Sequence, residues 1–317
     1  MATARVRTIL SAFLTFTIIA SGTPAIAIYG GTTATGNPIV VGLLNSQTAT
    51  SAGCSGALVA PRVVMTASHC LTRPAESVWI SAPGTDLRDK NTLRIQGEKY
   101  FIPATFSMSS FPFQNDFGII ILKSPFPNTQ VLEIANLDDV RRWMSEESSV
   151  IHLGYGCTAL VELPPCGVTS PTPNQITTVF SNEVPSQFSS LVAGTFSVTK
   201  ISVDKTICGG DSGSPILKEV SGKIIYVGSQ SSSNGAGCTK TCNLVCVATQ
   251  GLPGANVELV ESAFSYVANV VPTPIPTPTR ATVTQTVKKI TILCIKGKLS
   301  KKITGLKPIC PSGYKKK

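Results

Sequence analysis

The hydrophobic residues of this 317-residue chain fall into short segments that alternate with turns. Runs rich in Val, Ile, Thr and Phe occur, for example, at residues 38–44, 55–66, 117–122, 149–153 and 223–228. Gly, Pro, Asn and Ser separate these runs at short intervals, which is typical of all-β barrels and sandwiches. The pattern therefore predicts an all-β fold.

Helical spacing of apolar residues occurs in two stretches, residues 137–145 and 257–270. In the second stretch, the apolar side chains that recur at helical spacing are Leu259, Val260, Ala263, Phe264 and Val267. A β-rich first half, a connector, a β-rich second half and a closing helix predict two similar subdomains. We expect the binding site in a groove between them.

The first 27 residues have the three parts of a secretory signal peptide. Arg5 and Arg7 precede a mostly apolar stretch that ends near Ile19, and Ala25-Ile26-Ala27 has the small-x-small pattern of a cleavage site. A membrane anchor is the alternative, which the short apolar core disfavours. Export would also allow the ten cysteines to persist as disulfides.

The main domain, residues 28–271, is expected to end where a Pro- and Thr-rich linker begins at residue 272. After this linker, residues 272–289, a basic tail of residues 290–317 contains Cys294 and Cys310. We expect the tail to need a bridge between them, since it is too small for a core of its own.

Positive charge is concentrated after the main domain. Residues 272–317 carry eleven Lys or Arg and no acidic residue, whereas the main domain has 14 basic against 17 acidic residues. The net charge of +10 therefore describes the tail. It is poor evidence for nucleic-acid binding, so we expect no nucleic-acid partner.

The segment Cys208-Gly209-Gly210-Asp211-Ser212-Gly213-Ser214-Pro215 has the composition of a nucleophile turn. Glycines allow a tight turn that exposes the Ser212 hydroxyl, and the N–H groups of Gly210 and Ser212 could face a developing oxyanion. A serine nucleophile also needs a base and a buried acceptor that orients the base. The candidates are His69, within Thr66-Ala67-Ser68-His69-Cys70, and Asp116, which precedes an apolar strand.

On the strength of these motifs, the chain resembles the chymotrypsin-like (trypsin-fold) serine endopeptidases over about residues 28–270. Within that family it resembles a secreted bacterial member. Ile28-Tyr29-Gly30-Gly31 and the His69, Asp116 and Ser212 blocks follow the family's order. The separations of 47 residues from His69 to Asp116 and 96 from Asp116 to Ser212 also fit. The resemblance implies two six-stranded antiparallel β-barrels with a C-terminal helix and the site at their junction.

The resemblance assigns a role to each residue of the site. It implies His69 as general base and then general acid, Asp116 as its orienting partner and Ser212 as the acylated nucleophile. It also implies that a freed Ile28 amino group pairs with Asp211 and orders the oxyanion hole. Because the predicted signal-peptidase site ends directly before Ile28, we expect one cleavage both to export and to activate the enzyme, without a propeptide.

The resembling family places its specificity pocket near Thr206 and residues 231–233. Thr206 stands where an aspartate would select Arg or Lys, and Ser231, Ser232 and Ser233 stand where the pocket wall is expected. A trypsin-type preference is not supported, and we expect cleavage after small or medium uncharged residues. The second histidine, His152, lies in a strand pattern, and we expect it to be structural.

The cysteines support the same interpretation. Cys54 with Cys70 would tie the His69 loop, and the resemblance implies that Cys208 pairs with Cys238, although Cys242 or Cys246 could replace Cys238. The remaining pairs would then be Cys157–Cys166, Cys242–Cys246 and Cys294–Cys310. A metal site at the Cys238, Cys242 and Cys246 cluster is disfavoured in an exported chain, so we expect no metal and no cofactor.

The leading hypothesis is thus a secreted, monomeric serine endopeptidase acting on proteins or peptides. Two alternatives stay open, namely a catalytically silent binding module on the same fold and an esterase with the same triad. The tail is similar to lysine-rich C-terminal segments of some exported actinobacterial proteins. It could bind anionic cell-wall polymers or lipid head groups and retain the enzyme at the cell surface, or it could be a solubilising tail.

Overall fold

The computed structural model describes residues 28, 30–109, 111–157, 169–202, 205–233, 246–269 and 290–317. The chain divides into two compact units, Met1–Thr273 and Pro274–Lys317. The predicted signal peptide and linker lie outside the described residues. None of the described helices is long and apolar enough to cross a membrane.

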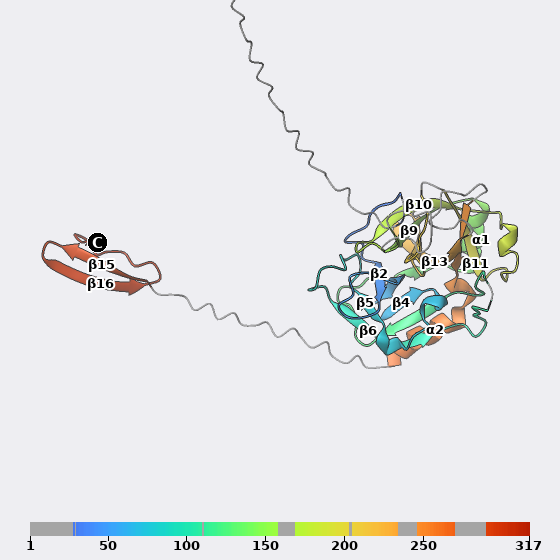
Figure 1. Cartoon of the computed structure of the whole chain (residues 1–317), viewed down its shortest axis with the longest axis horizontal. Helices are drawn as coiled ribbons and strands as arrows, with labels where there is room; N and C mark the ends of the chain where they lie inside the picture. The colour runs from blue at the N-terminus through green and yellow to red at the C-terminus, as the bar shows by residue number, and fades with distance from the viewer. Residues whose placement is uncertain are drawn as a thin grey trace, which may run out of the picture. The chain divides into compact units, whose positions relative to one another are not determined.

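The first barrel of the larger unit is a closed ring of six antiparallel strands in the order β2-β3-β4-β7-β6-β5 (Figure 1). Its strands are β2 (Val40–Leu44), β3 (Cys54–Ala60), β4 (Val63–Thr66), β5 (Trp79–Ser81), β6 (Arg94–Phe101) and β7 (Gly118–Leu122). Residues 55–66 stood as one segment in the sequence pattern. They form a hairpin instead, with the turn at Pro61 and Arg62, because proline cannot donate to a strand ladder.

The second barrel closes in the order β9-β10-β11-β14-β13-β12, with β12 pairing back to β9. Its strands are β9 (Ser149–Gly154), β10 (Asn174–Phe180), β11 (Phe196–Ile201), β12 (Pro215–Val220), β13 (Lys223–Ser233) and β14 (Cys246–Gly251). Two short strands extend it, β1 (Thr32–Thr33) beside β10 and β8 (Glu133–Ile134) parallel to β13. The predicted pair of six-stranded antiparallel barrels is confirmed.

Strand β2 illustrates how the cores are built. All five of its residues are buried, although alternate side chains on a strand point to opposite faces. Val41 and Leu43 pack with the interior of the first barrel, while Val40 and Leu44 belong to the core that also contains Leu153 and Tyr226 of the second barrel. The two barrels therefore share an apolar interface.

Two helices are present among the described residues, at the places where the sequence predicts them. Helix α1 (Leu137–Ser145) lies in the connector, and α2 (Val257–Asn269) closes the larger unit. Helix α2 packs on the first barrel (Figure 1), where Tyr266 Oη donates to Glu98 Oε1 at 2.7 Å. Short 3-10 turns complete the unit: η1 (Ser68–Cys70), η2 (Ala75–Ser77), η3 (Ser186–Phe188) and η4 (Pro253–Ala255).

The smaller unit contains a three-stranded antiparallel sheet in the order β16-β15-β17. Its strands are β15 (Ile290–Lys296), β16 (Leu299–Gly305) and β17 (Lys315–Lys316). A disulfide joins Cys294 to Cys310, as predicted. Residues 290–317 include eight lysines and no acidic residue, so this sheet is a cationic module.

Candidate active site

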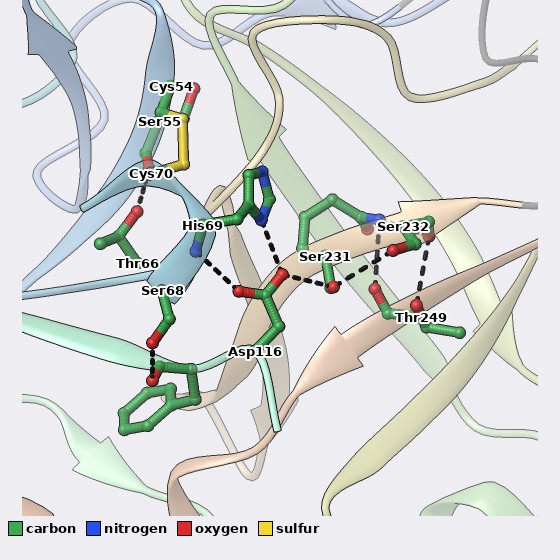
Figure 2. A network of polar contacts seen from close by, with 12 residues as sticks. Cys54, Ser55, Thr66, Ser68, His69, Cys70, Asp116, Ser231, Ser232 and Thr249 are labelled. Carbon is green, nitrogen blue, oxygen red and sulfur yellow. Dashed lines mark hydrogen bonds and ion pairs between the residues drawn. A yellow bond between two sulfur atoms is a disulfide. The ribbon is translucent and has the colours of Figure 1, made fainter. Parts of the chain in front are cut away.

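Two hydrogen bonds hold His69 to Asp116 (Figure 2). The backbone N–H of His69 donates to Asp116 Oδ1 at 2.9 Å, and Nδ1 lies 2.6 Å from Asp116 Oδ2. The Asp116 side chain is 1% exposed and the His69 side chain 15% exposed. Since a carboxylate oxygen accepts, Nδ1 is the donor in this contact, and Nε2 is the ring nitrogen left to act as a base.

Local contacts fix the segment that carries His69. The disulfide between Cys54 and Cys70 ties β3 to η1, as the sequence predicts. Ser68 Oγ donates to the Phe117 carbonyl at 2.5 Å, which joins η1 to the loop that carries Asp116. The imidazole also contacts the Phe113 ring, with the two centroids 5.2 Å apart. His69 is therefore held in its backbone and on one face of its ring.

Asp116 has a third partner, Ser231 on β13 of the second barrel (Figure 2). Ser231 Oγ donates to Asp116 Oδ2 at 2.6 Å. The sequence analysis placed Ser231 in the specificity pocket and gave it no role toward Asp116. This contact joins the two barrels at the candidate site and gives the buried carboxylate a further hydrogen-bond donor.

Ser212 lies on a tight turn before β12. Two glycines in this turn have a left-handed backbone conformation. Gly210 has φ 94° and Gly213 has φ 77°, values that disfavour other residues. A side chain at Gly213 would also collide with Thr66 Oγ1. The turn is closed by a 2.9 Å hydrogen bond from Ser214 N to the Asp211 carbonyl. Glycine at position 213 therefore permits the backbone to bring Ser212 this close to the first barrel.

Ser55 connects this turn to the first barrel and was not identified from the sequence. Its buried Oγ donates to the Gly210 carbonyl at 2.8 Å and accepts from Tyr155 N at 3.0 Å. Its backbone N–H donates to the Ser212 carbonyl at 2.8 Å. These contacts fix the carbonyl groups of Gly210 and Ser212, the two residues whose N–H groups are the predicted oxyanion donors.

Asp211 is fully buried beneath the same turn. Its carboxylate accepts hydrogen bonds from Gly156 N and Cys208 N, each at 2.8 Å. Burial raises the pKa of Asp211 to about 7, although the two backbone hydrogen bonds act in the opposite direction. Ile28, its predicted partner, is also completely buried. In the intact chain, however, its nitrogen is an uncharged amide.

Only part of the predicted specificity pocket lies within the described residues. Thr206 is buried, and its Oγ1 donates to the Ile207 carbonyl at 3.3 Å. Ser233 ends β13, and the continuation of this wall, residues 234–245, lies outside the described residues. The pairs Cys157–Cys166, Cys208–Cys238 and Cys242–Cys246 each include a cysteine outside the described residues and stay predictions.

His152 is buried in β9, away from these contacts. Its Nε2 lies 3.0 Å from Thr178 Oγ1 on the neighbouring strand β10. Burial lowers the pKa of His152 to about 3, so the ring is uncharged at neutral pH. This environment agrees with the structural role expected from the sequence.

Comparisons with known proteins agree with the architecture. Residues 28–250 match the sequence profile of the trypsin family. A chymotrypsin of Phaedon cochleariae is 26% identical over 200 residues, which covers 61% of this chain and 69% of the relative. The secreted serine protease VesC from Vibrio cholerae has a similar fold, with a TM-score of 0.55 and 17% identity. That match covers 73% of this chain but only 47% of VesC, so the chain spans about half of that structure. The profile match over most of the chain establishes that this protein belongs to the trypsin family of serine-type endopeptidases.

Proposed function

We propose that this chain is a secreted endopeptidase that cleaves peptide bonds through an acyl-enzyme on Ser212. The proposal rests on the two hydrogen bonds between His69 and Asp116, which direct Nε2 away from the carboxylate. The glycine-flanked turn with Ser212 adds the matching nucleophile. Family membership supports a protein or peptide substrate.

In the proposed reaction, Ser212 Oγ attacks the scissile carbonyl while His69 Nε2 takes its proton. The N–H groups of Gly210 and Ser212 stabilise the oxyanion, and Asp116 stabilises the imidazolium. His69 then protonates the leaving amine as the C–N bond breaks. Water deprotonated by His69 hydrolyses the acyl-enzyme and restores Ser212.

Hydrolysis of a denatured protein substrate by the exported enzyme tests this proposal. We expect Ser212→Ala to lower kcat by roughly 10⁵ or more while substrate still binds. Comparable peptide hydrolysis by Ser212→Ala would refute it. A wild-type protein that binds peptides without cleaving them would indicate a silent binding module, and cleavage of esters but not of peptides would indicate an esterase.

For specificity, we propose cleavage after small or medium uncharged residues. The uncharged, buried Thr206 supports this preference, because a cationic substrate side chain would lose its hydration there without a counter-charge. A peptide-library profile dominated by Arg or Lys at the cleaved position would contradict it, and Thr206→Asp should shift the profile toward those residues.

For activation, we propose that signal-peptide removal frees the Ile28 amino group, which then pairs with Asp211. Support comes from the burial of Ile28 and from a buried carboxylate whose high pKa a neighbouring cation would lower. N-terminal sequencing of the secreted, active enzyme should give Ile28 as the first residue. A start further upstream would require a propeptide, and full activity with a blocked Ile28 amine would exclude the ion pair.

For the smaller unit, we propose electrostatic binding to an anionic cell-wall polymer. Its eight lysines without an acidic residue support a polyanionic partner, and the Cys294–Cys310 disulfide makes the sheet a small stable platform. The two disulfides and the predicted leader also support an extracellular location.

A further inference from the structure

A reciprocal pair of side-chain amides joins Asn115, directly before Asp116, to Asn256, directly before α2. Asn115 Nδ2 donates to Asn256 Oδ1 at 2.9 Å, and Asn256 Nδ2 donates back to Asn115 Oδ1 at 2.9 Å. The two residues are 141 positions apart in the sequence. Each amide thus satisfies one donor and one acceptor of the other, which fixes their relative orientation.

Further hydrogen bonds hold both members of the pair in place. Asn115 Nδ2 also donates to Thr105 Oγ1 at 2.8 Å. Asn256 Nδ2 donates to the Leu252 carbonyl at 3.0 Å, and the Asn256 carbonyl accepts from Val260 N in the first turn of α2. Asn256 is therefore fixed to the start of α2, and the amide pair extends this support to Asn115.

The backbone of Asn115 needs that support. Its φ of 44° lies in the left-handed region, which non-glycine residues seldom adopt although asparagine tolerates it best. Asn115 is buried, so its amide could not exchange the partner for water. The left-handed turn sets the direction in which the next residue, Asp116, leaves the loop.

A residue of the second barrel also confines the backbone of Asp116. Gly251, the last residue of β14, approaches so closely that a side chain there would collide with the Asp116 carbonyl. Asp116 then meets His69 through both carboxylate oxygens. The loop that orients the candidate base thus rests on the β14–α2 connection.

We propose that Asn115 and Asn256 are positioning residues, whose amide pair aims Asp116 at His69. The inference rests on the proposed peptidase function and extends it to a pair of residues that acts only through Asp116. A shift of Asp116 would leave substrate binding intact but slow the proton transfers, because His69 would be oriented less well.

The test compares Asn256→Leu with a matched control, Asn136→Ala, in the full-length secreted enzyme. Asn136 precedes α1 as Asn256 precedes α2, and its side chain accepts a 2.8 Å hydrogen bond from Asp139 N but has no contact with Asp116. We expect Asn256→Leu to lower kcat roughly 10-fold with KM nearly unchanged. We also expect the far-downfield proton resonance of the His69–Asp116 hydrogen bond to move upfield. Asn136→Ala should retain both the wild-type kcat and the resonance.

Asn115→Gly is the second variant, for use if Asn256→Leu does not fold. Glycine adopts the left-handed φ freely but lacks the amide, so the same loss of kcat is expected. Wild-type kcat and resonance in a folded Asn256→Leu or Asn115→Gly enzyme would overturn the inference, as would an equal loss in Asn136→Ala. A wild-type enzyme without Ser212-dependent hydrolysis would instead refute the proposed function.

Discussion

Ser231 Oγ donates a 2.6 Å hydrogen bond to Asp116 Oδ2, across the junction of the two barrels. The same carboxylate oxygen lies 2.6 Å from His69 Nδ1. The Asp116 carboxylate is therefore held by His69 of the first barrel and by Ser231 of the second. The orientation of the candidate base depends on how the barrels pack together.

Replacing Ser231 should weaken catalysis without removing it. Ser231→Ala deletes one hydrogen bond to a buried carboxylate, and we expect kcat/KM to fall roughly 10-fold, consistent with a charged hydrogen bond. Ser145→Ala is the control, since Ser145 Oγ also donates a short hydrogen bond, to the Arg142 carbonyl at 2.7 Å on α1, and has no contact with Asp116. Steady-state kinetics on one peptide decide the matter, and equal activity of both variants would show that the Ser231 contact has no catalytic effect.

Asp211 should make the stability of the unprocessed chain depend on pH. Its pKa is raised from 3.8 to about 7, so between these values the unfolded chain loses a proton that the folded chain retains. The contribution of Asp211 to stability must therefore decline as pH rises from about 4 to about 7 and then level off. Buried His152, whose pKa is lowered from 6.5 to about 3, contributes in the opposite direction below pH 6.5, so the decline is read as the difference from a variant without Asp211. Denaturant unfolding of the unprocessed Ser212→Ala protein at pH 4.5 and 7.5 measures this decline.

The control for that experiment is Asp211→Asn in the same background, which cannot titrate and should lose the decline. In the processed chain, pairing of Asp211 with the Ile28 ammonium should remove the decline as well. An equal change in stability between the two pH values in Asp211→Asn and in its parent would show that the pKa of Asp211 is not raised by burial.

The disulfide between Cys54 and Cys70 should stabilise the larger unit. It closes a loop with a sequence separation of 16, for which the chain-entropy model gives about 3 kcal/mol. Cys54→Ala with Cys70→Ala should lower the unfolding free energy by about this amount and reduce activity, because η1 carries His69. The matched control replaces Cys294 and Cys310, which have the same separation, and should leave peptidase activity unchanged. Equal losses in both double variants would contradict this assignment.

Binding by the smaller unit should be electrostatic. We expect retention of the full-length enzyme on an anionic wall polymer to decrease steeply with salt, since exposed charges are screened over about 10 Å at 0.1 M. Deletion of residues 272–317 should release the enzyme without changing peptide hydrolysis. Retention of the truncated enzyme to the same extent would exclude this role.

Much of the architecture could be predicted from local patterns, since strand alternation and helical spacing are properties of neighbouring residues. Helix α1 begins and ends where its spacing indicates, and the Cys54–Cys70 bridge follows from the motif around His69. The contact of Ser231 with Asp116 could not be predicted in this way. A register irregularity between Gln230 and Ser232 interrupts the pairing of β13 with β14 there, and a bulge re-aims side chains without a sequence signature.

The Asn115–Asn256 pair is hidden from the sequence for a related reason. Both residues lie in irregular segments, where no periodicity indicates which side chains meet. Their contact depends on how the loop before β7 rests against the start of α2. Ser55 is a similar case, because a serine within a strand has no special signal until Gly210 and Tyr155 lie beside it.

Labelling with a fluorophosphonate probe tests the central claim most directly, because the probe reacts with a serine only where a base and oxyanion donors activate it. The account predicts that the folded, secreted protein is labelled at Ser212 alone, located by peptide mass spectrometry. Ser212→Ala should abolish the label. Ser214→Ala, two positions away, should still be labelled at Ser212. A folded protein that stays unlabelled, or a label that persists in Ser212→Ala, would contradict the account.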